Sequence, residues 1–172
     1  MPARAQAQAL DLKQALLEAY AVNERINQYL LEHLDDAAWN AAPPGGKGRT
    51  IAAIAAHMHN VRHMWLVAAA KGKPLPDKLD RATVTRKAAM QALAESAESI
   101  AQLLTASLDH PAGLVKGFRP DVVGAFGYFI SHDAHHRGQI AALARQLGYP
   151  LAKQAEFGMW EWGSRWKEIA RP

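Results

Sequence analysis

Four long stretches of the chain carry apolar residues at the spacing of an α-helix. This spacing gathers the apolar side chains on one helix face, whereas a half-buried strand would need alternating apolar and polar residues. No run of alternating β-branched residues occurs in the sequence. The pattern therefore predicts an all-α protein. Its helices are expected over about residues 10–34, 50–70, 83–108 and 120–147.

Proline, glycine and capping residues separate the four stretches. The Pro-Pro-Gly-Gly run at 43–46 interrupts the first connection, and the Gly- and Pro-containing residues 71–76 end the second helix, because neither residue type continues a helix well. Thr50 is suited to cap the second helix. Pro120 and Asp121 suit the first turn of the fourth. Four amphipathic helices of this length predict a four-helix bundle.

Length and composition limit the class of protein. A chain of 172 residues suits a single domain, residues 1–172, which buries roughly 70% of the surface of its unfolded form. The absence of cysteine excludes disulfides and thiolate ligands. No apolar signal core opens the chain and no window approaches the ~18 apolar residues of a membrane span, so we expect a cytoplasmic protein with no membrane partner. The net charge of +4 comes from scattered Lys and Arg residues, which predicts no nucleic-acid partner.

Three of the eight histidines fall within five residues of the fourth predicted helix. His132 and His136 lie one turn apart on the face that also carries Phe129 and Ile140, while His135 lies on the flank. Two imidazoles on an apolar stripe are costly to desolvate unless their nitrogens find partners. A metal ion is one such partner, and a carbonyl or carboxylate is the ordinary alternative.

The second predicted helix carries His57, His59 and His63. Its apolar stripe consists of Ile54, Met58, Val61, Met64 and Trp65. His57 lies about 40° from the centre of this stripe and is expected to face the core, whereas His59 and His63 lie about 160° away on a solvated face. Arg62 lies at the edge of the stripe, where it can meet an anionic group near His57 or a surface carboxylate.

Two other candidate sites are weaker. The loop residues 45–50 contain Gly and Lys but do not follow the order of a phosphate-binding loop, and no strand precedes them. Anion binding at the start of the next helix remains an open alternative there. Glu95 and Glu98 of the third helix do not lie squarely on its apolar stripe, so ligation of a metal by them is not favoured.

His57 together with His132 and His136 would give three imidazoles from two helices. Three neutral nitrogens suit Zn²⁺, Ni²⁺ or Fe²⁺, and three protein ligands leave a coordination position open for chemistry. Asp133 and Gln139 flank the histidine stripe at about 60°. Each is a candidate for supporting a ligand or contacting the substrate, and equally for a plain surface role.

Two segments together resemble the DinB/YfiT-like superfamily. One is Thr-Ile-Ala-Ala-Ile-Ala-Ala-His at 50–57, followed eight residues later by Trp65, and the other is His132-x-x-x-His136-Arg-Gly-Gln-Ile. The resemblance implies an up-down-down-up four-helix bundle, often a homodimer, with a divalent metal on His57, His132 and His136. Characterised relatives include thiol-dependent transferases and isomerases that use mycothiol, bacillithiol or glutathione. The family name derives from induction by DNA damage and implies no DNA binding.

The tail, residues 148–172, is short and rich in tryptophan. Trp160, Trp162 and Trp166 lie close together in the sequence. Aromatic side chains of this size are usually buried, so we expect their apolar area to lie against the bundle or against a second subunit.

Two functions remain in competition at the level of sequence. The first is a metal-dependent enzyme, a hydrolase or thiol transferase, in which the metal activates water or a low-molecular-weight thiol. Arg62, Asp133 or Gln139 would then steer a small-molecule substrate. The second is a non-catalytic stress-response protein whose metal is structural or vestigial.

Overall fold

A computed structural model describes residues 9–69 and 75–169 of the chain. Within these ranges all regular structure is helical, which confirms the all-α prediction. None of the helices there is long and apolar enough to cross a membrane. The helices are α1 (Leu12–Glu32), α2 (Ile51–Ala69), α3 (Arg86–Leu108), α4 (Val122–Gln146), α5 (Lys153–Gly158) and α6 (Trp162–Glu168), with short 3-10 turns at Asp36–Ala38 and Pro44–Gly46.

Side-chain caps set the starts of the four long helices. Asp11, Thr50, Thr85 and Asp121 each accept a hydrogen bond from a backbone N–H in the first turn of the helix that follows. Such caps satisfy N–H groups that have no partner within the helix. The expected cap at Thr50 is therefore confirmed. Pro120, expected in the first turn of α4, instead precedes the capping residue.

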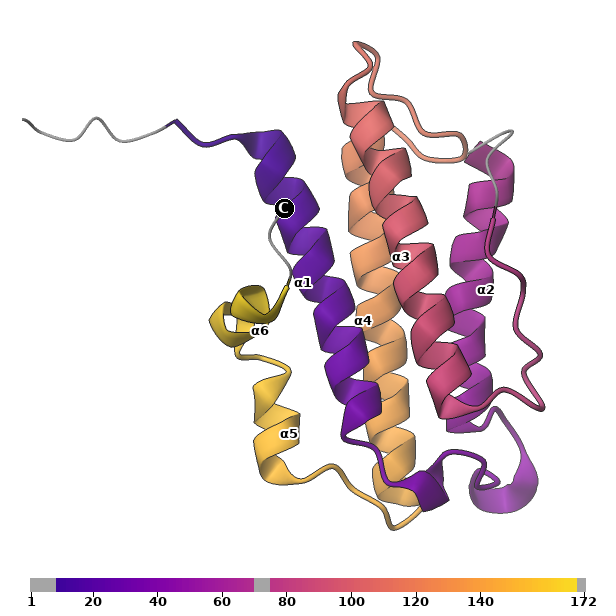
Figure 1. Cartoon of the computed structure of the whole chain (residues 1–172). Coiled ribbons are helices and arrows are strands. Elements are labelled where there is room, and N and C mark those ends of the chain that lie inside the picture. The colour runs from indigo at the N-terminus through magenta and orange to yellow at the C-terminus, as the bar shows by residue number, and fades with distance from the viewer. Residues whose placement is uncertain (1–8, 70–74, 170–172) are drawn as a thin grey trace, which may run out of the picture.

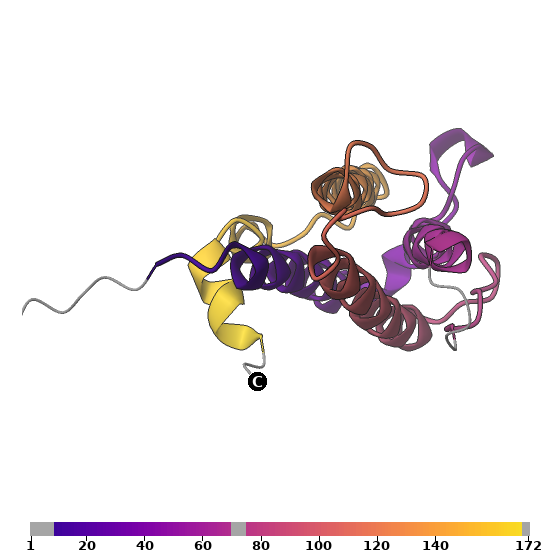
Figure 2. The ribbon, with the colours of Figure 1, turned by 90° about the horizontal axis from the view of Figure 1, so that it is seen from above.

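The four long helices lie side by side in two directions. Figure 1 shows α1 and α4 running one way and α2 and α3 running the other. Seen from above, α3 and α4 lie between α1 and α2, and each of them packs against both (Figure 2). The contact between α2 and α4 thus joins helices that are distant in sequence.

A buried polar layer divides the apolar core into two clusters. One cluster includes Leu30, Met58, Leu93 and Ile140, and the other includes Tyr20, Leu66, Ile100 and Phe129. Between the two levels, the long helices contribute buried polar side chains to the interior. These are Asn23, Glu24, Asn27, Arg62, Ser96, Asp133 and His136. Buried polar groups are costly unless they are paired, so this layer requires specific partners.

The tail forms α5 and α6, which pack against α1. Trp166 is half-buried there, and its indole N–H donates to Glu18 Oε2 at 3.1 Å. Trp160 and Trp162 are 84% and 46% exposed. Of the two alternatives expected for the tryptophans, burial against the bundle therefore holds in part for Trp166 but not for Trp160 or Trp162. Burial against a second subunit stays a prediction.

Candidate metal centre

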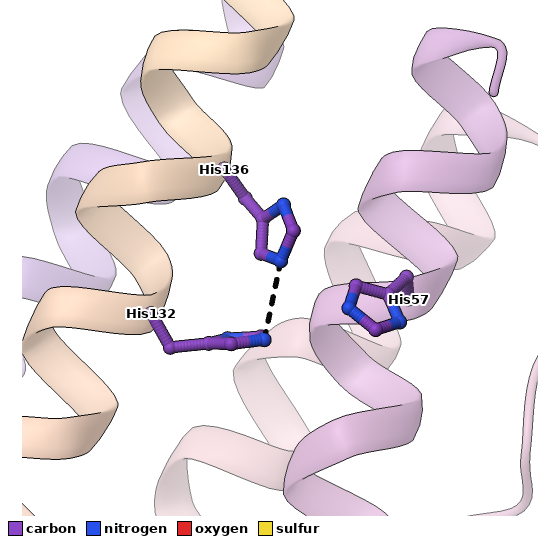
Figure 3. A group of neighbouring side chains, drawn as sticks. All are labelled: His57, His132 and His136. Atoms are coloured by element: carbon purple, nitrogen blue, oxygen red, sulfur yellow. Dashed lines mark hydrogen bonds between the residues drawn. The ribbon is translucent and has the colours of Figure 1, made fainter. Parts of the chain in front are cut away.

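Three imidazole rings converge between α2 and α4. His57 comes from α2, and His132 and His136 come from successive turns of α4. One ring nitrogen from each residue lies within 4.8 Å of the other two, and the ring centroids are 4.4–5.4 Å apart. Figure 3 shows the rings projecting from the two helices toward one another. The structure thus brings together the three histidines that the sequence singled out.

The hydrogen bonds of His136 fix which of its nitrogens is free. Its Nδ1 lies 2.7 Å from Gln139 Oε1, an oxygen that can only accept, so Nδ1 carries the proton. The lone pair on Nε2 then faces His132 Nε2, which is 3.2 Å away. Two nitrogens bound to one tetrahedral zinc, each about 2.0–2.1 Å from it, are about 3.3 Å apart. The donor set and this spacing therefore fit a shared divalent metal.

The surroundings of His57 and His136 favour the neutral form of their imidazoles. Burial and the positive charges of Arg49 and Arg81, together with the other two histidines, lower the pKa of His57 to about 4. Burial also lowers the pKa of His136, although its hydrogen bond to Gln139 acts in the opposite direction. A neutral imidazole is the form that ligates a metal. His57 and His136 are therefore in a ligating state at neutral pH.

Asp133 and Arg62 form a buried ion pair directly behind the triad. Asp133 Oδ2 lies 2.7 Å from Arg62 Nη2, and both side chains are 1% exposed. Burial alone would raise the pKa of Asp133, but the charge of Arg62 and hydrogen bonds outweigh it and hold that pKa well below its usual range. Asp133 Oδ1 is also 4.0 Å from His132 Nδ1. Both residues can support the site, but they do not lie at its surface to steer a substrate.

A comparison with known protein families covers the residues that form this site. The sequence profile of the DinB family matches residues 6–162. The chain belongs to the DinB family. The match contains all four long helices of this DinB protein and all three clustered histidines. A comparison with curated proteins finds no match. Family membership and the three-histidine group are together compatible with a metal-binding protein.

Residues of α1 in this DinB chain complete the support of Asp133, and sequence reasoning missed them. The amides of Asn23 and Asn27 donate to Asp133 Oδ2 at 2.7 and 3.0 Å. Arg137 donates in turn to the side-chain oxygens of both asparagines, at 2.8 and 2.6 Å. A signal was present in the sequence, since Asn23 continues the three- and four-residue register of the apolar stripe of α1. A polar residue at a core position implies a buried partner.

The helical wheel predicted a solvated face for His59 and His63 of α2, and this prediction is wrong for His59. His59 is fully buried, with Nδ1 2.9 Å from the carbonyl of Ala92 and Nε2 2.8 Å from that of Asp77. The face expected to be solvated is covered by α3 and by the segment that precedes it, residues 75–85. His63 is half-buried. Arg62, expected at the edge of the stripe, is also fully enclosed.

Gln139 is exposed and contacts the triad directly. Besides accepting from His136, its amide Nε2 donates to His135 Nε2 at 3.0 Å. Of the three residues proposed to assist the site, it alone both touches a histidine of the triad and lies at the protein surface. Glu95 and Glu98 are exposed on α3 and are not part of the triad.

Proposed function

We propose that this DinB-family protein is a divalent-metal-dependent enzyme whose metal is held by His57, His132 and His136. The observation that carries the proposal is the convergence of three imidazoles from two helices, with no cysteine in the chain and with His57 and His132 only half-buried. The reaction class we propose is hydrolysis or thiol transfer on a small-molecule substrate. From the family resemblance alone we add a homodimer, and the cytoplasmic location expected from the sequence stays a prediction. The opposed pairs of long helices support the up-down-down-up bundle that the family resemblance implies.

Each residue of the site has a task in this proposal. The three histidines bind the metal, and Gln139 holds His136 in the tautomer that presents Nε2. A bound Zn²⁺, Ni²⁺ or Fe²⁺ would supply Lewis-acid chemistry, lowering the pKa of water or of a low-molecular-weight thiol. His57 and His132 are only half-buried, which leaves one side of the group accessible to small molecules.

The alternative is a non-catalytic bundle with a structural or vestigial metal. A structural role would be favoured if aromatic side chains enclosed the site completely. Tyr128 does stack on His132, with centroids 5.7 Å apart, and Trp65 lies against Tyr128. However, the tryptophan-rich tail packs on α1, away from the side of the bundle where α2 meets α4. Access to the histidines therefore favours the catalytic proposal.

Metal analysis of protein purified without a histidine tag tests the proposal. We expect about one zinc, nickel or iron ion per chain, and substoichiometric metal in His57→Ala, His132→Ala and His136→Ala, because two imidazoles alone bind a divalent metal weakly. His110→Ala, in an exposed turn, is the matched control and should retain the metal. Circular dichroism checks that each variant remains helical.

Cobalt substitution separates the enzyme from the structural alternative. An open coordination position predicts that the visible spectrum of the cobalt protein changes when a small thiol such as β-mercaptoethanol is added. An unchanged spectrum would favour a closed, structural site. Full metal content in all three histidine variants would refute metal binding at the triad itself.

A further inference from the structure

Two arginines near the triad form no ion pair with a carboxylate in the part of the chain that the structure describes. Arg81, in the segment between α2 and α3, is exposed, and its Nη2 lies 3.4 Å from His57 Nδ1. Arg49 is exposed and directly precedes Thr50, which caps α2. No ion pair joins either arginine to a carboxylate within residues 9–69 and 75–169, whereas Arg25 and Arg86 both have such partners.

The contact between Arg81 and His57 cannot persist when His57 binds a metal. A guanidinium only donates, so this contact requires a lone pair on Nδ1. A metal on Nδ1 would use the same lone pair. A metal on Nε2 would require the proton to be on Nδ1, where it opposes the N–H of Arg81. In either case the guanidinium of Arg81 is released next to the metal.

The charge of the loaded site would then be strongly positive. The three ligands are neutral, and no carboxylate belongs to the ligand group in the described part of the chain. The carboxylate behind the triad, Asp133, is already paired with Arg62 and with the α1 amides. Arg49 lies directly before the cap of α2, the helix whose second turn carries His57, and after burial its charge is one of the causes that lower the pKa of His57 and of His136. A cluster of cations without counter-charge attracts an anion and holds it with charge-assisted hydrogen bonds.

We propose that the substrate of this site carries an oxyanion, a carboxylate or phosphate group, which Arg81 and Arg49 hold beside the metal. The inference rests on the proposed function, since it assumes a metal on the three histidines. Arg81 would bind the histidine in the metal-free protein and the substrate anion in the loaded protein. The two arginines would thus determine which substrates are accepted.

Benzoate and benzamide are matched probes for this inference, because they share a shape and differ in charge. In ligand-observed NMR titrations of the zinc-loaded full chain, we expect benzoate to bind about ten-fold more tightly than benzamide, the effect of one charge-assisted hydrogen bond. The double variant Arg49→Gln with Arg81→Gln should lose this preference, and Arg81→Lys should retain most of it. Arg145→Gln, which removes an exposed arginine from α4 with no carboxylate partner in the described residues, should keep it.

Zinc affinity provides a readout that does not depend on the probe. Arg81→Gln should bind zinc severalfold more tightly than the parent, because it removes both the competing contact to His57 and a nearby positive charge. A merely structural role for Arg81 predicts weaker zinc binding or no change.

The outcomes separate the inference from the function on which it rests. A parent chain that takes up no zinc would refute the proposed metal site, and this inference with it. If zinc binds but the benzoate preference is absent, survives in the double glutamine variant, or is lost equally in Arg145→Gln, the inference alone is wrong.

Discussion

Single hydrogen bonds at the triad determine how its nitrogens are oriented. Gln139 is exposed, yet its amide oxygen is the partner of His136 Nδ1 at 2.7 Å. Without that acceptor, the ring of His136 could rotate or take the other tautomer, and its free lone pair would no longer face His132. A partner of this kind raises metal affinity without touching the metal.

Replacement of Gln139 tests this role. Gln139→Ala should weaken zinc binding by about 10–100-fold, the usual effect of losing such a partner, while Gln139→Glu keeps an acceptor and should bind zinc at least as well as the parent. Competition with a chromogenic chelator measures the affinities, and Gln146→Ala, also exposed on α4, serves as the control. Equal zinc affinity in Gln139→Ala and the parent would show that the hydrogen bond has no part in ligation.

At the scale of helices, the sequence predicted well which long helices form and where they begin and end. It predicted less well which faces of these helices are buried. Caps and apolar register are local properties, so each long helix falls inside its predicted range. A helical wheel, however, assumes one buried stripe, and α2 packs against both α3 and α4. His57 faces α4 as expected, whereas His59 is buried against the backbone of α3 and of the segment before it. Which second face is buried depends on tertiary contacts that periodicity does not encode.

The polar layer links α2 to three other helices through one guanidinium. Arg62 of α2 donates to Glu24 of α1 and to Asp133 of α4, both at 2.7 Å, and to the carbonyl of Leu93 in α3 at 2.9 Å. The sequence suggested that Arg62 meets an acidic group, but not that the group lies in the core. A buried charge of this kind is stable only while its partners are present.

Arg62→Met removes the cation and leaves two carboxylates without it. We expect the free energy of unfolding to fall by about 3–5 kcal/mol, the cost of breaking a buried ion pair on one side. Urea unfolding followed by circular dichroism measures the change. Lys13→Met breaks an exposed pair with Asp109 and should cost no more than about 1 kcal/mol. Comparable losses in the two variants would mean that the buried layer contributes little to stability.

At the scale of the whole molecule, the tail and the histidine site lie on different sides of the bundle. The helices α5 and α6 contact α1, while the triad lies between α2 and α4 (Figures 1 and 2). Arg165 of α6 lies over the ring of Tyr29, 3.9 Å from its centroid. The docking of two helices this short could not be predicted from the sequence, because six or seven residues are too few to establish an apolar period.

Gly158 allows α5 to approach α1 closely, so its substitution tests whether tail and site are independent. A Cβ at this position would lie 2.2 Å from Tyr29 Oη, and the clash must move either the ring or the tail. Gly158→Ala should therefore lower the free energy of unfolding by about 1–3 kcal/mol and alter the tryptophan fluorescence, since the tail carries three of the five tryptophans. Zinc stoichiometry should remain that of the parent.

Gly163→Ala in α6 is the control for this substitution. A Cβ at that position meets nothing within 4 Å, so the variant should be neutral or slightly stabilising. Loss of zinc from Gly158→Ala, with its helices intact, would show instead that the tail, through α1 and its contacts to Asp133, holds α4 in the position that the histidines require.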